Sequence, residues 1–243
     1  GKLPSPGGRP AAPSAVPAPS AVPGQAGVYA DVDTAVQAAR RAQEELAACT
    51  LETRRAMIAA MRAAALAARE SLARQAVEET GMGRVADKGL KNHVAAELTP
   101  GVEDLEARCF SDDHGLTLVE KAPYGVIGSI TPSTNPTETI INNAIGMVAA
   151  GNAVVFNPHP AARRVSAATV DLLNRAMHAK GGPESLLCTL AEPTIQSAQA
   201  LFDHPRVNLL VVTGGPAVVR AAMRSAKKTI AAGPGNPPVV VDE

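Results

Sequence analysis

Hydrophobic and polar positions divide the chain into three parts of different character. Residues 1–28 hold seven of the twenty prolines, set among alanines and small polar residues. Such a segment buries little apolar surface and is predicted to be a disordered Pro/Ala-rich linker. In residues 29–112 apolar side chains recur every three or four positions, and in residues 113–243 they form short runs. The pattern therefore predicts a helical part followed by an α/β domain.

The helical part contains signals for three helices. Asp33 is a candidate N-cap for the first helix, and Thr50 for a second, long helix rich in Ala, Leu, Met, Arg and Glu. Gly81 and Gly83 interrupt the pattern, and a third helix is predicted over 85–98.

Strands and helices alternate in the last part. "GLTLVEKAPYGVIGSI" predicts two strands separated at Ala122-Pro123. Further strands are predicted at 153–158, 185–190, 207–214 and 229–235 and in "PPVVVDE", with helices at 136–150, 161–180, 195–202 and 216–225. The strands are apolar throughout, which is typical of a parallel sheet with helices on both faces. The predicted fold class is therefore α/β.

Each predicted strand ends in a loop rich in Gly, Pro, Asn or hydroxyl residues: "TPSTN", "NPHP", "AEP", "GGP" and "GPGNP". Any one of these loops is an ordinary connection. Five of them meet at the carboxyl edge of the predicted sheet, where open α/β sheets bind ligands. Loops of this kind expose backbone N–H groups near helix N-termini, which favours an anionic ligand. The GxGxxG fingerprint of dinucleotide-binding proteins is absent.

Composition excludes several classes of protein. Zero net charge, a pI near 7.1 and 2% aromatic residues argue against nucleic-acid binding. The sequence has no uninterrupted run of about 18 apolar residues, so no membrane span is predicted. No signal peptide is evident. Three widely spaced cysteines, without CxxC spacing, indicate a reduced, cytoplasmic protein without a zinc site.

Two long segments, "APYGVIGSITPSTNPTETIINNAIGMVAAGNAVVFNPHPAARRVS" and "VVTGGPAVVRAAMRSAKKTIAAGPGNPPVVVDE", closely resemble the aldehyde dehydrogenase superfamily. Within it they are most similar to CoA-acylating enzymes of bacterial microcompartments, of the propanediol- and ethanolamine-utilisation type. The resemblance extends from about residue 29 to the end. It implies a Rossmann-type parallel sheet with N-terminal helices, and a reaction of aldehyde, NAD and CoA to acyl-CoA and NADH through a cysteine thioester.

In that family the nucleophilic cysteine belongs to a catalytic domain further along the chain. None of Cys49, Cys109 and Cys188 lies in a matching motif; Cys109 is predicted to lie in a connector and Cys188 to be a buried, inert thiol. We therefore expect the chain to be the N-terminal cofactor-binding portion, without the catalytic domain and inactive alone.

The resemblance also assigns the site residues. Asn135 would donate its side-chain amide to the oxyanion that develops during the reaction, in a loop stiffened by Pro132 and Pro136. From the residues alone, the favoured role of Asn135 would be to cap the following helix. The residues expected to bind the cofactor are Thr131, Pro132, Ser133, Asn157, His159, Pro160, Thr213, Gly214, Gly215, Gly233 and Gly235.

Two departures from hydrolytic aldehyde dehydrogenases point to the acylating type. Hydrolytic members carry Lys-Pro and an acidic residue where this chain has "NPHP". They also carry Glu-Leu-Gly-Gly, whose Glu activates water, where this chain has "AAGPGNP" without an acid. Because water attack needs a general base, an acyl-enzyme here would pass to a thiol such as CoA.

The resemblance further implies a small aldehyde substrate, a homo-oligomer when full length, assembled through a hairpin near "GLTLVEKAPYGVIG", and contact with microcompartment shell proteins. The expected location is the cytoplasm, inside a microcompartment. An encapsulation helix is expected either to have been removed or to lie upstream. Two alternatives remain: a non-catalytic nucleotide-binding or assembly fragment, and the aldehyde dehydrogenase part of a bifunctional alcohol/aldehyde dehydrogenase. "PSTNPTETIINN" fits the microcompartment type better than the bifunctional one.

Overall fold

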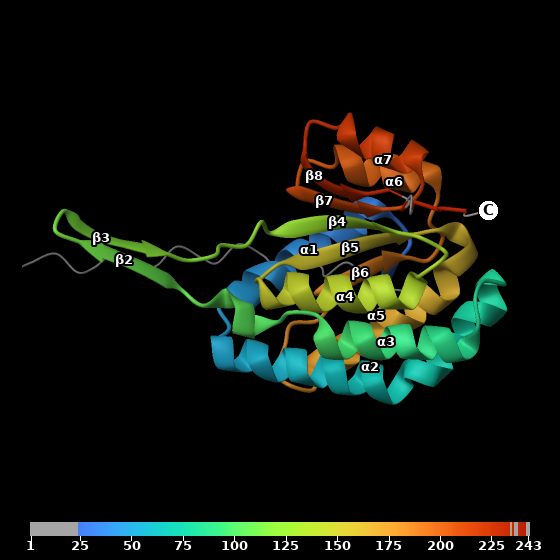
Figure 1. Cartoon of the computed structure of the whole chain (residues 1–243), viewed down its shortest axis with the longest axis horizontal. Coiled ribbons are helices and arrows are strands. Elements are labelled where there is room, and N and C mark those ends of the chain that lie inside the picture. The colour runs from blue at the N-terminus through green and yellow to red at the C-terminus, as the bar shows by residue number, and fades with distance from the viewer. Residues whose placement is uncertain (1–23, 234, 236–237, 242–243) are drawn as a thin grey trace, which may run out of the picture.

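A parallel sheet of six strands forms the centre of the molecule (Figure 1). The structure is a computed structural model and describes residues 24–233, 235 and 238–241. The strands are β1 (Val28–Tyr29), β4 (Val126–Thr131), β5 (Ala153–Pro158), β6 (Leu187–Leu190), β7 (Leu209–Thr213) and β8 (Lys228–Ala232). Neighbouring strands of this sheet pair in parallel, and β4 and β5 are buried at every position. The predicted parallel α/β sheet is confirmed.

The strand order is β1-β6-β5-β4-β7-β8. The chain passes from β4 outward to β5 and β6, and then crosses back to place β7 on the other side of β4. Connections therefore leave β4 and β7 in opposite directions, and a crevice forms outside their carboxyl ends. This switch point determines where a ligand can enter.

Helices cover both faces of the sheet. They are α1 (Val32–Ala47), α2 (Leu51–Thr80), α3 (Val85–Leu98), α4 (Pro136–Ala149), α5 (Arg163–His178), α6 (Ile195–Asp203) and α7 (Pro216–Met223), with 3-10 turns η1 (Val102–Leu105) and η2 (Pro160–Ala162). Helices α4 and α5 pack on β4, β5 and β6, and α2 and α3 form a further layer over them (Figure 1). One hydrophobic core joins α1 and α2 to the sheet.

The N-caps of α1 and α2 in the structure can be compared with the two predicted from the sequence. Thr50 caps α2 as predicted, because its side chain accepts a hydrogen bond from the N–H of Thr53. The prediction for α1 was wrong: Asp31, not Asp33, accepts from the N–H of Thr34 at 2.8 Å. Val32 lies between the two acids and is 8% exposed. Its burial starts the helix earlier than the polar pattern indicates.

The strands β2 (Arg108–Asp112) and β3 (Gly115–Val119) form a separate antiparallel hairpin that projects from the body (Figure 1). The predicted strand within "GLTLV" is confirmed, but it does not join the main sheet. The prediction that Cys109 lies in a connector was wrong, because Cys109 pairs with Leu118 in this hairpin. Both strands are exposed at every position, but in β3 Leu116 and Leu118 alternate with Thr117, whereas "RCFSD" of β2 shows no such alternation. The predicted domain division between 112 and 113 falls at the hairpin turn and stays a prediction.

The two ends of the chain lie partly outside the described residues. Most of the predicted linker does, and its last described residues lead through a turn at Gly24–Gly27 into β1. The strand predicted in "PPVVVDE" is not formed over 238–241. The side chains of Val239 and Val240 are 82% and 91% exposed. Because strand preference depends on packing against neighbours, these valines alone do not form a strand.

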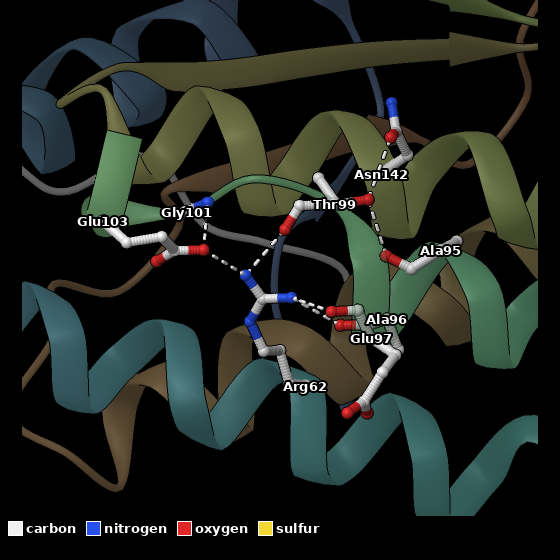
Figure 2. Close-up of polar contacts among 8 residues, drawn as sticks. All are labelled: Arg62, Ala95, Ala96, Glu97, Thr99, Gly101, Glu103 and Asn142. Atoms are coloured by element: carbon white, nitrogen blue, oxygen red, sulfur yellow. Dashed lines mark hydrogen bonds and ion pairs between the residues drawn. The ribbon is translucent and has the colours of Figure 1, made fainter. Parts of the chain in front are cut away.

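The C-terminal end of α3 is fixed by Arg62 of α2 (Figure 2). Its guanidinium donates to the carbonyl oxygens of Ala96 and Glu97 at 2.8 and 2.9 Å, and to that of Thr99 at 2.6 Å. These are carbonyls that the helix itself leaves without partners. The Thr99 hydroxyl donates to Asn142 of α4 at 2.9 Å, so the same end of α3 is tied to two other helices.

Candidate functional site

A cavity of about 580 Å³ lies at the carboxyl edge of the sheet. The loops that follow β4, β5, β7 and β8 line it. All twelve residues that the sequence singles out border this cavity, namely Thr131, Pro132, Ser133, Asn135, Asn157, His159, Pro160, Thr213, Gly214, Gly215, Gly233 and Gly235. The structure therefore brings together residues that lie up to about 100 positions apart in the chain.

Other lining residues were not predicted. Thr194, Ile195 and Ala198 come from the start of α6, and Val218 comes from α7. The sequence pattern indicated the loop "AEP" after β6, which stops one residue short of Thr194. Ile195 is 84% exposed, an unusual state for a large apolar side chain. Together these side chains give the cavity an apolar wall that faces its polar loops.

Thr131 ends β4 and is 1% exposed. Its Oγ1 atom has no hydrogen-bond partner among the described residues. A buried hydroxyl without a partner is costly, so this atom is well suited to a ligand group in the cavity. The main-chain oxygen of Thr131 accepts from the N–H of His159 at 3.0 Å, which fixes the loops after β4 and β5 against each other.

Asn157 lies near the end of β5 and His159 directly follows this strand, but their side chains have different roles. Asn157 is 4% exposed; its Oδ1 accepts from Ser197 Oγ at 2.5 Å and its Nδ2 donates to the carbonyl oxygen of Thr194 at 3.5 Å. Both ends of its amide hold α6, so Asn157 supports the cavity wall. His159 is exposed, and its Nδ1 accepts from the N–H of Ala161 at 3.2 Å. Its Nε2–H is left as a donor for a ligand.

Glycines form the rim on the β7 and β8 side. A Cβ atom added to Gly215, Gly233 or Gly235 would meet nothing within 4 Å. At Gly214, by contrast, it would lie 2.9 Å from Val218 Cγ1. The missing side chains leave backbone exposed to the cavity, as the close approach of a phosphate-containing ligand requires.

Asn135 lies directly before α4, whose first residue is Pro136. Its side chain makes no capping hydrogen bond, so the alternative role as a helix cap is not realised. Oδ1 accepts from Lys91 Nζ at 3.0 Å, and Nδ2 donates to no described residue. Asn135 and Thr213 also border a second hollow between α3 and α4, so the amide stands where two openings meet.

No cysteine of the chain lines the cavity. Cys188 is fully buried in β6, and burial raises the pKa of its thiol. Cys109 is exposed on the hairpin, and Cys49 is partly exposed after α1. The described residues hold no group of three His, Cys, Asp or Glu side chains placed to bind a metal ion. Among the described helices, none is long and apolar enough to cross a membrane.

Comparisons of sequence and of structure both find proteins similar to this chain. Over 218 residues the chain is 56% identical to the acetylating acetaldehyde dehydrogenase EutE of Salmonella typhimurium, covering 89% of this chain and 46% of that protein. It matches an engineered glycolyl-CoA reductase with bound NADP+ at 51% identity and a TM-score of 0.86, covering 89% of this chain and 50% of that one.

A third similar protein is a propionaldehyde dehydrogenase from the fucose-utilisation microcompartment of Clostridium phytofermentans. The identity is 48% and the TM-score 0.86, over 88% of this chain and 49% of that one. The chain thus spans about half the length of the relatives it matches. Residues 19–243 match the model of the aldehyde dehydrogenase family. The chain therefore belongs to the aldehyde dehydrogenase family.

Proposed function

We propose that this chain is the cofactor-binding half of a CoA-acylating aldehyde dehydrogenase. The full reaction would convert a small aldehyde, NAD and CoA into acyl-CoA and NADH through a cysteine thioester. One observation carries the proposal: twelve residues chosen from the sequence border a single cavity at the switch point of the sheet. The similarity to acetylating and CoA-linked relatives gives further support.

The cavity suits a nucleotide. The bare glycine rim leaves room for phosphates, and the unpartnered hydroxyl of Thr131 offers a polar contact. Ile195, Ala198 and Val218 form an apolar wall against which a flat adenine ring would pack. When bound, the nicotinamide cofactor accepts the hydride that leaves the aldehyde carbon.

Asn135 would stabilise the oxyanion. Its Oδ1 is already bonded to Lys91, which leaves the two N–H groups of Nδ2 for a ligand. An amide N–H stabilises negative charge and does not itself titrate. Pro132 and Pro136 restrict the loop on both sides, so the donor is held in place before substrate arrives.

The acceptor of the acyl group would be CoA. No Asp or Glu side chain lines the described wall of the cavity. Water attack on a thioester is slow without a general base, whereas a thiol is a good nucleophile. The relative that reduces glycolyl-CoA supports a CoA ester as the partner of this chemistry.

We further propose a place inside a bacterial microcompartment, supported by the propionaldehyde dehydrogenase of the fucose-utilisation compartment. Assembly into a homo-oligomer would use the projecting hairpin of β2 and β3, whose Phe110, Leu116 and Leu118 are 57–69% exposed. Shell proteins are the proposed partners within the compartment.

Calorimetry on this chain with NAD, NADP and CoA tests the cofactor site. Gly215→Val places a side chain in open cavity space, and its φ of −68° suits valine, so the fold should persist. We expect micromolar nucleotide binding, weakened about tenfold or more in Gly215→Val and unchanged in Asn135→Ala. A folded chain that binds none of the three ligands would contradict the proposal.

The acyl-transfer step needs the catalytic half. A fusion of this chain with the second half of the Salmonella relative should form acetyl-CoA from acetaldehyde. In that fusion Asn135→Ala should lower kcat by about 10²–10³. An unchanged kcat in Asn135→Ala would contradict the proposed oxyanion role of Asn135.

A further inference from the structure

Two lysines of α3 reach the loop that carries Asn135. Lys88 Nζ donates to the main-chain oxygen of Thr134 at 2.7 Å, and Lys91 Nζ donates to Asn135 Oδ1 at 3.0 Å. Lys88 and Lys91 are three residues apart and therefore point to the same side of the helix. One helix thus holds the backbone of one loop residue and the side chain of the next.

We propose that Lys91 is a positioning residue for Asn135, which it turns so that Nδ2 faces the reacting atoms. The proposal rests on the oxyanion role proposed for Asn135. An ammonium group has three donors and no acceptor, so it can bond only the oxygen of an amide. If the amide flipped, Nδ2 would face Lys91 donor to donor. The contact therefore selects one of two otherwise similar orientations of the side chain.

Lys88 keeps the loop backbone at the distance that this contact needs. It is 2% exposed, and its Nζ lies 3.8 Å from Oε1 of Glu138, which is itself 7% exposed. The Thr137 hydroxyl donates to Asn92 Oδ1 of α3 at 2.7 Å and lies 3.1 Å from Glu138 Oε2. A buried charge is costly unless it is paired, and this ion pair, which is not a hydrogen bond, places Lys88 of α3 beside the first turn of α4.

The far end of α3 is tied as well. Arg62 holds the carbonyl oxygens of its last turn, and Thr99 donates to Asn142 of α4 (Figure 2). Helices α3 and α4 are therefore joined near the loop and again further along α4. A helix held at both ends cannot slide along its neighbour, so Lys91 Nζ stays within reach of Asn135.

Two substitutions of Lys91 and one substitution of a distant lysine form a matched set of variants. Lys91→Met keeps the apolar stem and removes the donor, whereas Lys91→Arg restores a donor and the charge. Lys180 is exposed beyond the end of α5, away from the cavity, so Lys180→Met controls for loss of charge. Thermal unfolding of all three variants checks that the fold is retained.

The side-chain amide of Asn135 reports its orientation directly. In a proton–nitrogen correlation spectrum of this chain, its signal pair is identified by its absence in Asn135→Ala. We expect Lys91→Met to shift and broaden this pair, and Lys91→Arg and Lys180→Met to leave it sharp. An unchanged pair in Lys91→Met would overturn the proposal.

Turnover of the fusion protein provides the second readout. We expect Lys91→Met to lower kcat about tenfold with unchanged KM for the nucleotide, and Lys91→Arg to restore most of it. In an Asn135→Ala background Lys91→Met should have no further effect. An equal loss in both backgrounds would show that Lys91 does not act through Asn135 and would overturn the proposal. If Asn135→Ala keeps full turnover while the amide signal still depends on Lys91, the oxyanion role of Asn135 is wrong. Lys91 would then orient the amide without any effect on catalysis, which would also overturn the proposal.

Discussion

The guanidinium of Arg62 donates to the main-chain oxygen of Thr99 at 2.6 Å, just beyond the last residue of α3. Its side chain is 20% exposed, and it serves two further carbonyl oxygens of the same helix end. A cation at a helix C-terminus also interacts favourably with the helix dipole. This single side chain therefore satisfies most of the free carbonyl groups at one end of α3.

Arg62→Met should lower the free energy of unfolding by about 2 kcal/mol, because three carbonyl groups, two of them in partly buried bonds, lose a charged donor. Urea unfolding of this chain measures the change. Arg40→Met is the matched control, since Arg40 pairs with Glu44 only on the exposed surface of α1. That variant should change stability by about 0.5 kcal/mol or less. Equal effects of the two substitutions would contradict the prediction.

Gly27 and Gly24 have the same φ of +84° but different surroundings. A Cβ atom on Gly27 would lie 2.2 Å from the main-chain oxygen of Leu187 and 2.4 Å from Asn174 Nδ2. On Gly24 it would meet nothing within 4 Å. Gly24→Ala should cost only the backbone strain of about 1–2 kcal/mol. Gly27→Ala should cost at least about 3 kcal/mol by urea unfolding, since strain and steric overlap combine. Similar costs would argue against the close approach of Gly27 to Leu187.

The three cysteines should differ sharply toward a thiol reagent at pH 8. Cys109 is exposed, Cys49 is partly exposed, and Cys188 is buried with its pKa raised by that burial. Because only the thiolate reacts, Cys109 should be modified first, Cys49 more slowly and Cys188 only after unfolding. Mass spectrometry of labelled peptides gives the order. Modification of Cys188 in the native chain would contradict its placement in β6.

Asp31 links stability to pH. The N–H and hydroxyl groups of Thr34 donate to its carboxylate and hold its pKa below the ordinary range. A depressed folded-state pKa gives stabilisation that is present above the unfolded value of about 4 and is lost as pH falls through the folded value. Asp31→Ala should therefore cost about 1 kcal/mol at pH 7.

The same substitution should cost progressively less below pH 4. Asp113→Ala is the control, since Asp113 is exposed in the turn between β2 and β3 and caps no helix. A cost of Asp31→Ala that stays constant from pH 7 to pH 3 would show that the cap does not depend on the charge of Asp31.

Features encoded by neighbouring residues could be predicted from the sequence. The cavity residues follow strand ends, where apolar runs give way to glycine, proline and hydroxyl side chains, so their meeting follows from parallel topology. Lys88 and Lys91 could not be found in this way. Their spacing is that of any polar helix face, and only the packing of α3 against α4 brings them to Asn135. The hairpin strand at Cys109 was missed because its sequence, "RCFSD", does not alternate apolar and polar residues as its partner "GLTLV" does.

The pairing of β1 with β6 has a consequence for how the protein is made. Val28 lies opposite Thr189, about 160 residues later in the chain. At roughly 5–20 residues per second, synthesis leaves Val28 without its partner strand for about 10–30 seconds. The packing of helix α1 is delayed as well, because its alanine-rich face packs on β5 and β6, which are made later. Strand β1 is therefore made long before the strand with which it pairs, and segments so distant in sequence pair slowly.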